Sequence, residues 1–202
     1  MRAFFAIDLP DELADGISDV QDGLRGAAGL RFTDPEQAHV TLAFLGDVPE
    51  ETTGTETGAS DEPTPKGDVD AAIEAGRRAV EEADVEPFTV GVGGLGVFPS
   101  MEYISVVWAG VDDGAAELAR LHETLEERTA ALGYEPDDHE FTPHVTLARM
   151  NDARGKDLVQ RVVRERDPDV GTFTAEAVRL KRSRLTSDGP VYETVESFPL
   201  SG

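Results

Sequence analysis

The pentapeptide His-Val-Thr-Leu-Ala occurs twice in this sequence, at residues 39–43 and 144–148. Histidine titrates near neutral pH, so of two imidazoles at one site, one can serve as a general base while the other, protonated, serves as a general acid. Threonine hydroxyls can donate hydrogen bonds to phosphate oxygens as negative charge develops on them. Two such histidines and two such threonines suit phosphodiester chemistry without a metal ion.

Each copy of the pentapeptide is rich in β-branched and apolar residues, which predicts a strand. Side chains alternate between the two faces of a strand, so His39 and Thr41 project together while the valine and leucine point to the opposite layer. The same holds for His144 and Thr146. An internal repeat indicates a duplicated half-domain. We therefore expect the two His/Thr pairs to meet across one cleft.

The other two histidines are given structural roles. His122 lies beside Glu123 on a predicted helix and is expected to be a solvated surface residue, whereas His139 lies in an acidic stretch that favours a loop role over cation binding. A zinc ion held by His39, His144 and a carboxylate is an alternative, but no His-x-x-x-His or comparable ligand spacing supports it. We predict that the site uses no metal and no cofactor.

The elements that must position the motifs follow from the apolar pattern. Apolar residues at steps of three and four predict helices at residues 10–26, 69–84, 113–132 and 154–166. Short apolar and β-branched runs predict strands at residues 4–7, 31–33, 39–46, 88–92, 103–111, 144–147, 172–185 and 192–200. This order predicts an α/β (α+β) fold with two pseudo-symmetric lobes of mainly antiparallel sheet, helices on the outer faces and a central cleft.

Two segments rich in small or polar residues lie between these elements. Residues 91–99 are glycine-rich and are expected to join two strands of a hairpin through a bulge and turn. No Gly-Lys-Ser/Thr follows them, which argues against a phosphate-binding loop. Residues 47–68 have almost no apolar residues and predict a flexible acidic surface loop. We expect residues 1–202 to form a single bilobal domain.

The composition limits the setting in which this chain can work. Its net charge of -23 comes from 41 acidic and 18 basic residues, and it has no cysteine, which excludes disulfides and thiol nucleophiles. Such a charge would repel nucleic acid at low ionic strength, but multimolar salt shortens the Debye length to about 3 Å. This favours a salt-loving host. No apolar stretch approaches the roughly 18 residues of a membrane span, so we expect a soluble, cytoplasmic protein.

Arginines gather late in this otherwise acidic chain. Arg149 directly follows the second motif, yet strict alternation places it on the face opposite His144, so that only a twist or bulge would bring it to the cleft. For the group as a whole, substrate binding and pairing with surface acids are both open. Its members are Arg149, Arg154, Arg161, Arg164, Arg166, Arg179, Arg182 and Arg184.

Five segments resemble the two-histidine (2H) phosphoesterase superfamily, and specifically its RNA 2',3'-cyclic phosphodiesterase branch, historically called 2'-5' RNA ligases. They span nearly the whole chain, at residues 2–10, 39–46, 93–99, 141–149 and 182–186, the last of which leads to residues 189–193. The resemblance implies a bilobal α/β fold and metal-independent hydrolysis of a ribose 2',3'-cyclic phosphate to a 2'-phosphomonoester.

The resemblance also implies a role for each motif residue. His39 would be the proton donor to the departing 3'-oxygen, His144 would be the proton acceptor that activates water, and Thr41 and Thr146 would hold the phosphate. Because the motifs are identical, the sequence alone does not decide which histidine is the acid. Position 43 is alanine where many relatives carry lysine, and alternation places it on the face of His39, so phosphate binding is expected to depend more on the threonines or a late arginine.

The expected partners are RNA ends or small nucleotides that carry a 2',3'-cyclic phosphate, tRNA halves among them, bound by a monomer with no membrane contact. Joining RNA ends by a 2'-5' bond is the chemical reverse of the hydrolysis and needs the same residues. The alternative from another class is a non-catalytic protein that binds RNA ends in the same cleft. The intact His and Thr pairs argue against that alternative.

Overall fold

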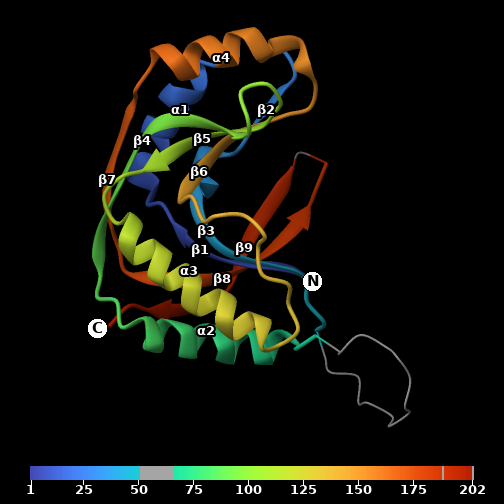
Figure 1. Ribbon diagram of the computed structural model, residues 1–202, viewed down its shortest axis with the longest axis vertical. Helices are drawn as coiled ribbons and strands as arrows, with labels where there is room; N and C mark the ends of the chain where they lie inside the picture. The colour runs from blue at the N-terminus through green and yellow to red at the C-terminus, as the bar shows by residue number, and fades with distance from the viewer. Residues whose placement is uncertain (51–65, 188, 202) are drawn as a thin grey trace.

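The elements that carry the motifs are described by a computed structural model covering residues 1–50, 66–187 and 189–201 (Figure 1). Most of the loop predicted at 47–68 lies outside these residues. The strands are β1 (Arg2–Asp8), β2 (Leu30–Phe32), β3 (His39–Asp47), β4 (Phe88–Pro99), β5 (Ile104–Val111), β6 (His144–Met150), β7 (Asp169–Ala175), β8 (Ala177–Leu185) and β9 (Pro190–Pro199). The α-helices are α1 (Ala14–Asp22), α2 (Val69–Ala83), α3 (Ala115–Ala130) and α4 (Lys156–Glu165).

The strands form one nine-stranded antiparallel sheet in the order β7-β4-β5-β6-β3-β1-β8-β9, with β2 paired to β6. The two motif strands, β3 and β6, are neighbours at its centre, and each is followed outward by the strands of its own half. Within the described residues one register pair, Val40 with Val145, joins the halves. We call this junction the central seam. The predicted α/β fold of antiparallel sheet and helices is confirmed, and its two halves are parts of one continuous sheet.

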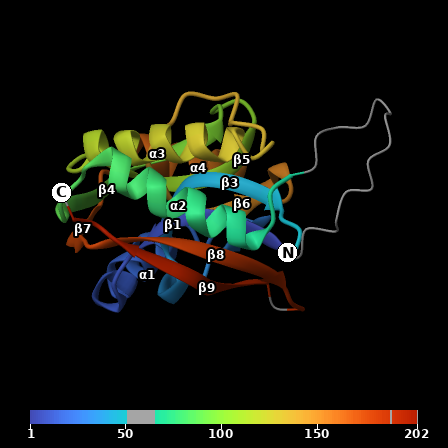
Figure 2. The same ribbon diagram turned by 90° about the horizontal axis from the view of Figure 1, so that it is seen from below.

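The helices pack on the sheet in two groups. Figure 1 shows α1 and α4 at one end of the molecule and α2 and α3 at the other, and Figure 2 shows α2 and α3 running side by side. Helix α3 packs on β3, whereas α1 packs on β6 and β7. Each motif strand therefore has a helix behind it. Among the helices of the described residues, none is both long and apolar enough to cross a membrane.

Helices α3 and α2 contribute side chains of different size to the core. Helix α3 buries three leucines completely, Leu118, Leu121 and Leu125. Helix α2 instead presents small residues, and a Cβ atom at Gly76 would lie 2.6 Å from the ring of Phe5. Glycine thus allows α2 to approach the sheet closely enough to bury that ring.

The glycine-rich segment forms the predicted bulge, whereas the predicted turn lies beyond it. Residues 91–99 are part of β4, and the turn to β5 follows at residues 100–103. The predicted hairpin is confirmed, with a register shift between Gly93 and Gly96. The ring of Trp108 lies against Gly96, where a Cβ atom would come within 2.1 Å of it. The glycines therefore make room for an indole ring on the strand rather than a turn between strands.

Two predicted element boundaries also change. The first helix ends at Asp22 rather than near residue 26, because the chain then forms tighter turns, with Leu24 N donating to Gln21 O at 2.9 Å. The strand predicted at residues 172–185 is two strands, β7 and β8, separated at Glu176. The break arises because β7 pairs with β4 in one half of the sheet and β8 pairs with β1 in the other.

Candidate active site

The predicted site residues gather at the central seam. The motif strands run antiparallel there, and extending the seam register by one residue in each direction places His39 across from Thr146 and Thr41 across from His144. Directly opposed residues of an antiparallel pair carry their side chains on the same face, a few ångströms apart. The seam therefore brings two imidazoles and two hydroxyls together on one face of the sheet, which we call the site face.

Burial supports this arrangement of the motif side chains. The first five residues of β3 and of β6 show the same pattern, in which the histidine and threonine are half-buried and the remaining three residues are buried. The apolar residues of both motifs pack into the main core, where none is more than 3% exposed: Val40, Leu42, Ala43, Val145, Leu147 and Ala148. The core thus anchors each strand and leaves the polar pair toward solvent.

A β-bulge interrupts the first motif strand at its leucine. Pairing with β1 passes from Thr41 to Ala43 and skips Leu42. One extra residue reverses the alternation of side chains beyond it, so Ala43 joins the core and Phe44 emerges on the site face, 59% exposed. The prediction that Ala43 shares a face with His39 is wrong for this reason.

The second motif strand has the same bulge at the equivalent leucine. Pairing with β5 passes from Thr146 to Ala148 and skips Leu147. The reversal buries Ala148 and returns Arg149, which is exposed, to the face of His144. Strict alternation predicted the opposite face for Arg149, and the bulge explains the difference.

Both histidines are held in the same tautomer. His39 donates from Nδ1 to the carbonyl oxygen of Gln37 at 2.8 Å, and His144 donates from Nδ1 to that of Thr142 at 2.7 Å. A carbonyl oxygen can only accept, so each Nδ1 carries a proton. The nitrogen left to gain or lose a proton is therefore Nε2 in both rings.

His39 lies between two aromatic rings. Its ring centroid is 5.0 Å from that of Phe4 and 5.0 Å from that of Tyr192, which meets it edge-on at 82°. Burial among these rings lowers the pKa of His39, because the charged imidazolium loses solvation, although the hydrogen bond to Gln37 opposes this.

His144 has an equivalent pair of aromatic neighbours. Its ring centroid lies 4.9 Å from that of Phe98, edge-on at 82°, and 6.0 Å from that of Trp108. Burial again lowers the pKa of His144, the hydrogen bond to Thr142 raises it, and the positive charge of Arg149 lowers it further. The two histidines therefore have similar aromatic surroundings but different charged neighbours.

An ion-pair cluster lies beside His39, and no counterpart to it is described beside His144. Asp8 is the register partner of His39. Its carboxylate accepts hydrogen bonds from Lys181 Nζ at 2.7 and 2.8 Å and from Arg179 Nη1 at 2.7 Å. Asp8 raises the pKa of His39, while Lys181 and the second histidine lower it. A carboxylate thus favours the protonated state of His39 only.

Two arginines lie side by side at the edge of the site. Arg31 of β2 is the register partner of Arg149 in β6, and no ion pair to a carboxylate is formed by either within the described residues. Both act on the phenol of Tyr192: burial raises its pKa, and the two guanidinium groups lower it. Like charges directly opposed across strands repel one another, so this pair is suited to an anion between or above them.

Of the predictions for the other two histidines, that for His139 is confirmed and that for His122 is wrong. His139 is exposed, with Nδ1 3.1 Å from an oxygen of Asp137, in agreement with a loop role. His122 is not a solvated residue: its ring stacks on Phe141 at 4.2 Å, and Nδ1 lies 2.7 Å from the carbonyl oxygen of Leu42. It faces the sheet because it shares the buried stripe of α3.

Sequence reasoning also missed Gln21 of α1. Its side chain is 2% exposed and donates from Nε2 to the carbonyl oxygens of Thr33 and Leu147 at 2.8 and 3.1 Å. The available signal was position: Gln21 follows Ile17 by four residues, and His122 follows Leu118 by four, so both polar residues lie within apolar helical stripes.

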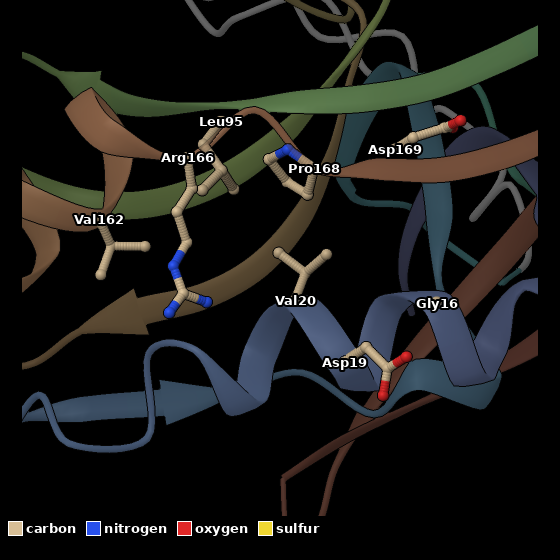
Figure 3. A pocket seen from close by; sticks show the side chains of 8 residues that line it. All are labelled: Gly16, Asp19, Val20, Leu95, Val162, Arg166, Pro168 and Asp169. Atoms are coloured by element: carbon tan, nitrogen blue, oxygen red, sulfur yellow. The ribbon is translucent and has the colours of Figure 1, made fainter.

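Two cavities lie away from the histidines. One, of about 210 Å³, lies between α1 and the segment that follows α4 (Figure 3) and is lined by Gly16, Asp19, Val20, Leu95, Val162, Arg166, Pro168 and Asp169. The other is lined by Met1, Glu50, Val69, Asp70, Arg182, Glu193, Thr194 and Val195. In the part of the chain that the structure describes, no three His, Asp or Glu side chains are grouped so that they could hold a metal ion.

Comparisons with known proteins agree with the fold and with the sequence resemblance. The chain is 34% identical over 202 residues to the RNA 2',3'-cyclic phosphodiesterase of Methanothermobacter thermautotrophicus, covering 99% of each chain. It is 35% identical over 167 residues to the protein of the same name from Aeropyrum pernix, covering 82% of this chain and 84% of that one.

Solved structures show the same architecture. The structure of TT0787 from Thermus thermophilus matches with a TM-score of 0.75 and 29% identity, covering 99% of this chain and 98% of that one. That of E. coli LigT complexed with 3'-AMP matches with a TM-score of 0.68 at 22% identity, covering 100% of this chain and 98% of that one, and shows the fold alone. The model of the 2'-5' RNA ligase superfamily matches residues 9–185, and the chain belongs to that superfamily.

Proposed function

We propose that this protein is an RNA 2',3'-cyclic phosphodiesterase, which opens a terminal 2',3'-cyclic phosphate to a 2'-phosphomonoester. The observation that carries the proposal is the meeting of two His/Thr pairs at the central seam, with Nε2 of each histidine available for proton transfer. Relatives that match this chain over nearly its whole length are named for that activity.

The proposed reaction is an in-line displacement at phosphorus. Nε2 of neutral His144 takes a proton from water as the water oxygen attacks phosphorus, and the bond from phosphorus to the ribose 3'-oxygen breaks. Nε2–H of protonated His39 gives its proton to that departing oxygen. Thr41 and Thr146 donate hydrogen bonds to the non-bridging oxygens, whose negative charge grows in the transition state.

The charge difference between the two halves supports this assignment of acid and base. His39 has the carboxylate of Asp8 as its register partner, which favours an imidazolium there. His144 has Arg149 as its charged neighbour, which favours a neutral imidazole. The duplicated motif supplies two equal histidines, and their surroundings make them unequal.

Arg149 and Arg31, which form no ion pair with a carboxylate among the described residues, would supply the phosphate-binding charge that the first motif lacks. Arg149 returns to the site face through the bulge, and Arg31 is directly opposite it. We assign Arg149 to the cyclic phosphate and Arg31 to the RNA phosphate that precedes the terminal nucleotide. In a chain of net charge -23, such local cations would offset the repulsion of RNA by the rest of the surface.

The natural substrates would be RNA ends with a cyclic phosphate, including tRNA halves, acted on by a monomeric, cytoplasmic enzyme without a metal ion. The reverse reaction, 2'-5' joining of RNA ends, would use the same groups. If the chain were instead a binding protein for RNA ends, it would retain the RNA without converting it.

The test is product analysis on an RNA oligonucleotide with a 2',3'-cyclic phosphate end, in concentrated KCl with EDTA. The wild type should yield the 2'-phosphate, and His39→Ala and His144→Ala should each abolish turnover. His139→Ala is the matched control, because that histidine is exposed and pairs only with Asp137 among described residues; it should retain full activity. Binding without conversion in the wild type would refute the enzyme, and loss of activity in EDTA would refute the metal-free mechanism.

A further inference from the structure

The bulges in the two motif strands create a local problem for the backbone. Leu42 and Leu147 are the residues that the register skips, so neither has a paired residue in the strand that forms the bulge with it. Both are buried, at 2% and 0% exposure. A buried carbonyl group without a hydrogen bond is costly, so each of these two must find another partner.

In β3 the partner comes from α3. Nδ1 of His122 donates to the carbonyl oxygen of Leu42 at 2.7 Å, and because that oxygen can only accept, Nδ1 must carry a proton. The imidazole ring stacks on Phe141 with an interplanar angle of 7°. Phe141 lies three residues before His144 in the chain. His122 therefore touches the first motif directly and the segment that leads into the second.

In β6 the partner comes from α1. Nε2 of Gln21 donates to the carbonyl oxygen of Leu147 at 3.1 Å and to that of Thr33 at 2.8 Å. Leu147 O also accepts from Thr33 N at 3.0 Å. Gln21 thus ties the end of β2 to the bulge of β6, and it shares the Leu147 carbonyl with a backbone donor.

We infer that His122 and Gln21 are positioning residues, each holding in place the bulge of one motif strand and through it the histidine and threonine of that motif. The inference concerns the same site as the proposed function and rests on it where activity is the readout. Both residues act through main-chain carbonyls, so neither is expected to touch the substrate.

The importance of the bulge follows from strand geometry. A shift of pairing by one residue exchanges the two faces of a strand. A bulge that moved along β3 would turn Thr41 or Phe44 toward the core, and one that moved along β6 would do the same to Thr146 or Arg149. A bulge held at its leucine therefore keeps the polar side chains of each motif strand on the site face.

The two contacts differ in how much each motif depends on them. The Leu42 carbonyl accepts from a side chain, whereas the Leu147 carbonyl keeps the backbone donor of Thr33 when Gln21 is lost. Loss of His122 should therefore disturb catalysis more than loss of Gln21. General helix packing would not predict this ordering, because both side chains belong to helices that pack on the sheet.

The experiment separates the hydrogen bond of His122 from its ring. His122→Phe keeps a ring to stack on Phe141 but removes the donor, and His122→Asn keeps a donor near the Nδ1 position but removes the ring. We expect His122→Phe to lower kcat by about 10- to 100-fold with little change in KM, as misplacement of reacting groups does. His122→Asn should recover most of this loss, and Gln21→Met should lower kcat by about 10-fold or less.

Thr129→Val is the matched control. Thr129 is a buried polar residue of α3, and its hydroxyl bonds to Leu125 O of the same helix at 2.8 Å. This variant should leave kcat unchanged. Equal losses in Thr129→Val and His122→Phe would overturn the inference, since they would point to helix packing in general. Wild-type kcat in both His122→Phe and Gln21→Met would also overturn it.

A second readout does not depend on activity. With ¹⁵N-labelled histidine, the ring signals of His39 should move in His122→Phe and recover in His122→Asn, and those of His144 should move in Gln21→Met. The wild type should show a slowly exchanging Nδ1–H signal for His122. These results decide the inference even if the wild type lacks phosphodiesterase activity. If His122→Phe does not fold, the His144 signals in Gln21→Met and the wild-type Nδ1–H signal decide it. Unmoved His144 signals in Gln21→Met, or the lack of a protected Nδ1–H signal in the wild type, would refute it.

Discussion

Replacing Asp8 by asparagine would test the proposal that His39 is the general acid. The carboxylate of Asp8 raises the pKa of His39, and Lys181 lowers it. Asp8→Asn removes the raising effect of the carboxylate and leaves the lowering effect of Lys181 unopposed. The pKa of His39 should therefore fall. A nearby opposite charge favours the charged form of a titratable group. If His39 is the proton donor, the high-pH limb of kcat/KM, where that donor loses its proton, should therefore move to lower pH.

The same substitution should destabilise the fold by an amount that the ion-pair geometry sets. The side chain of Lys181 is 9% exposed and that of Asp8 is 19% exposed. Removing one partner of a buried ion pair costs about 3 to 5 kcal/mol, and the lower end applies because asparagine keeps one oxygen that Lys181 can reach. At about 2 to 4 °C per kcal/mol for a chain of this length, Tm should fall by roughly 6 to 12 °C.

A double variant separates the two effects. Asp8→Asn with Lys181→Met removes the raising and the lowering influence on His39 together, so most of the limb shift and most of the loss in Tm should be reversed. The assay is kcat/KM at constant ionic strength across the range in which histidine titrates, with a thermal melt of each variant. Arg149→Met is the complement: it should raise the pKa of His144 and move the low-pH limb to higher pH.

Two results would contradict this assignment of the acid. Movement of the low-pH limb alone in Asp8→Asn would make His39 the base and exchange the roles proposed above. Unchanged limbs would mean that the charge of Asp8 does not affect the pKa of His39 that is seen in the pH profile. Because two interacting histidines titrate as a pair, the limb positions should be compared with the ¹⁵N signals of each ring.

Three further outcomes are expected. Thr146→Val should lower kcat about 100-fold while the melt stays near that of the wild type, as loss of one donor to a developing oxyanion does; an unchanged kcat would contradict the role of that hydroxyl. Arg31→Met should raise KM for a cyclic-phosphate oligonucleotide and leave that for a cyclic mononucleotide unaltered, so an equal rise for both would count against a second phosphate contact. Leu121→Ala, in the core of α3, should cost about 2 to 5 kcal/mol in a denaturant titration, and a smaller loss would show that the site can collapse.

Much of the fold could be predicted because the relevant patterns are local. The leucines Leu118, Leu121 and Leu125 recur at helical spacing, and His39 and Thr41 alternate with buried residues as a strand requires. These rules place side chains relative to their own element. They were sufficient to put the motif strands and the helices behind them in order.

The errors arose where one element acts on another. Alternation within β6 says nothing about the pairing with β5 that skips Leu147, so the face of Arg149 was predicted from a rule that the bulge breaks. His122 was placed in solvent because it is polar, although its spacing from Leu118 puts it on the buried side of α3. Polar residues in an apolar stripe indicate a buried partner, and the sequence alone does not name that partner.

At the central seam, the size of the buried side chains should affect how far apart the two motif histidines lie. Val40 and Val145, fully buried, form the one register pair described between the motif strands, and His39 and His144 each come immediately before one of these valines. A continuous ladder would fix the separation and crossing angle of the strands by many hydrogen bonds. With one described register pair, the two isopropyl groups and the core beneath them should contribute to that separation, so we expect a change of side-chain size at Val40 or Val145 to alter the distance between His39 and His144.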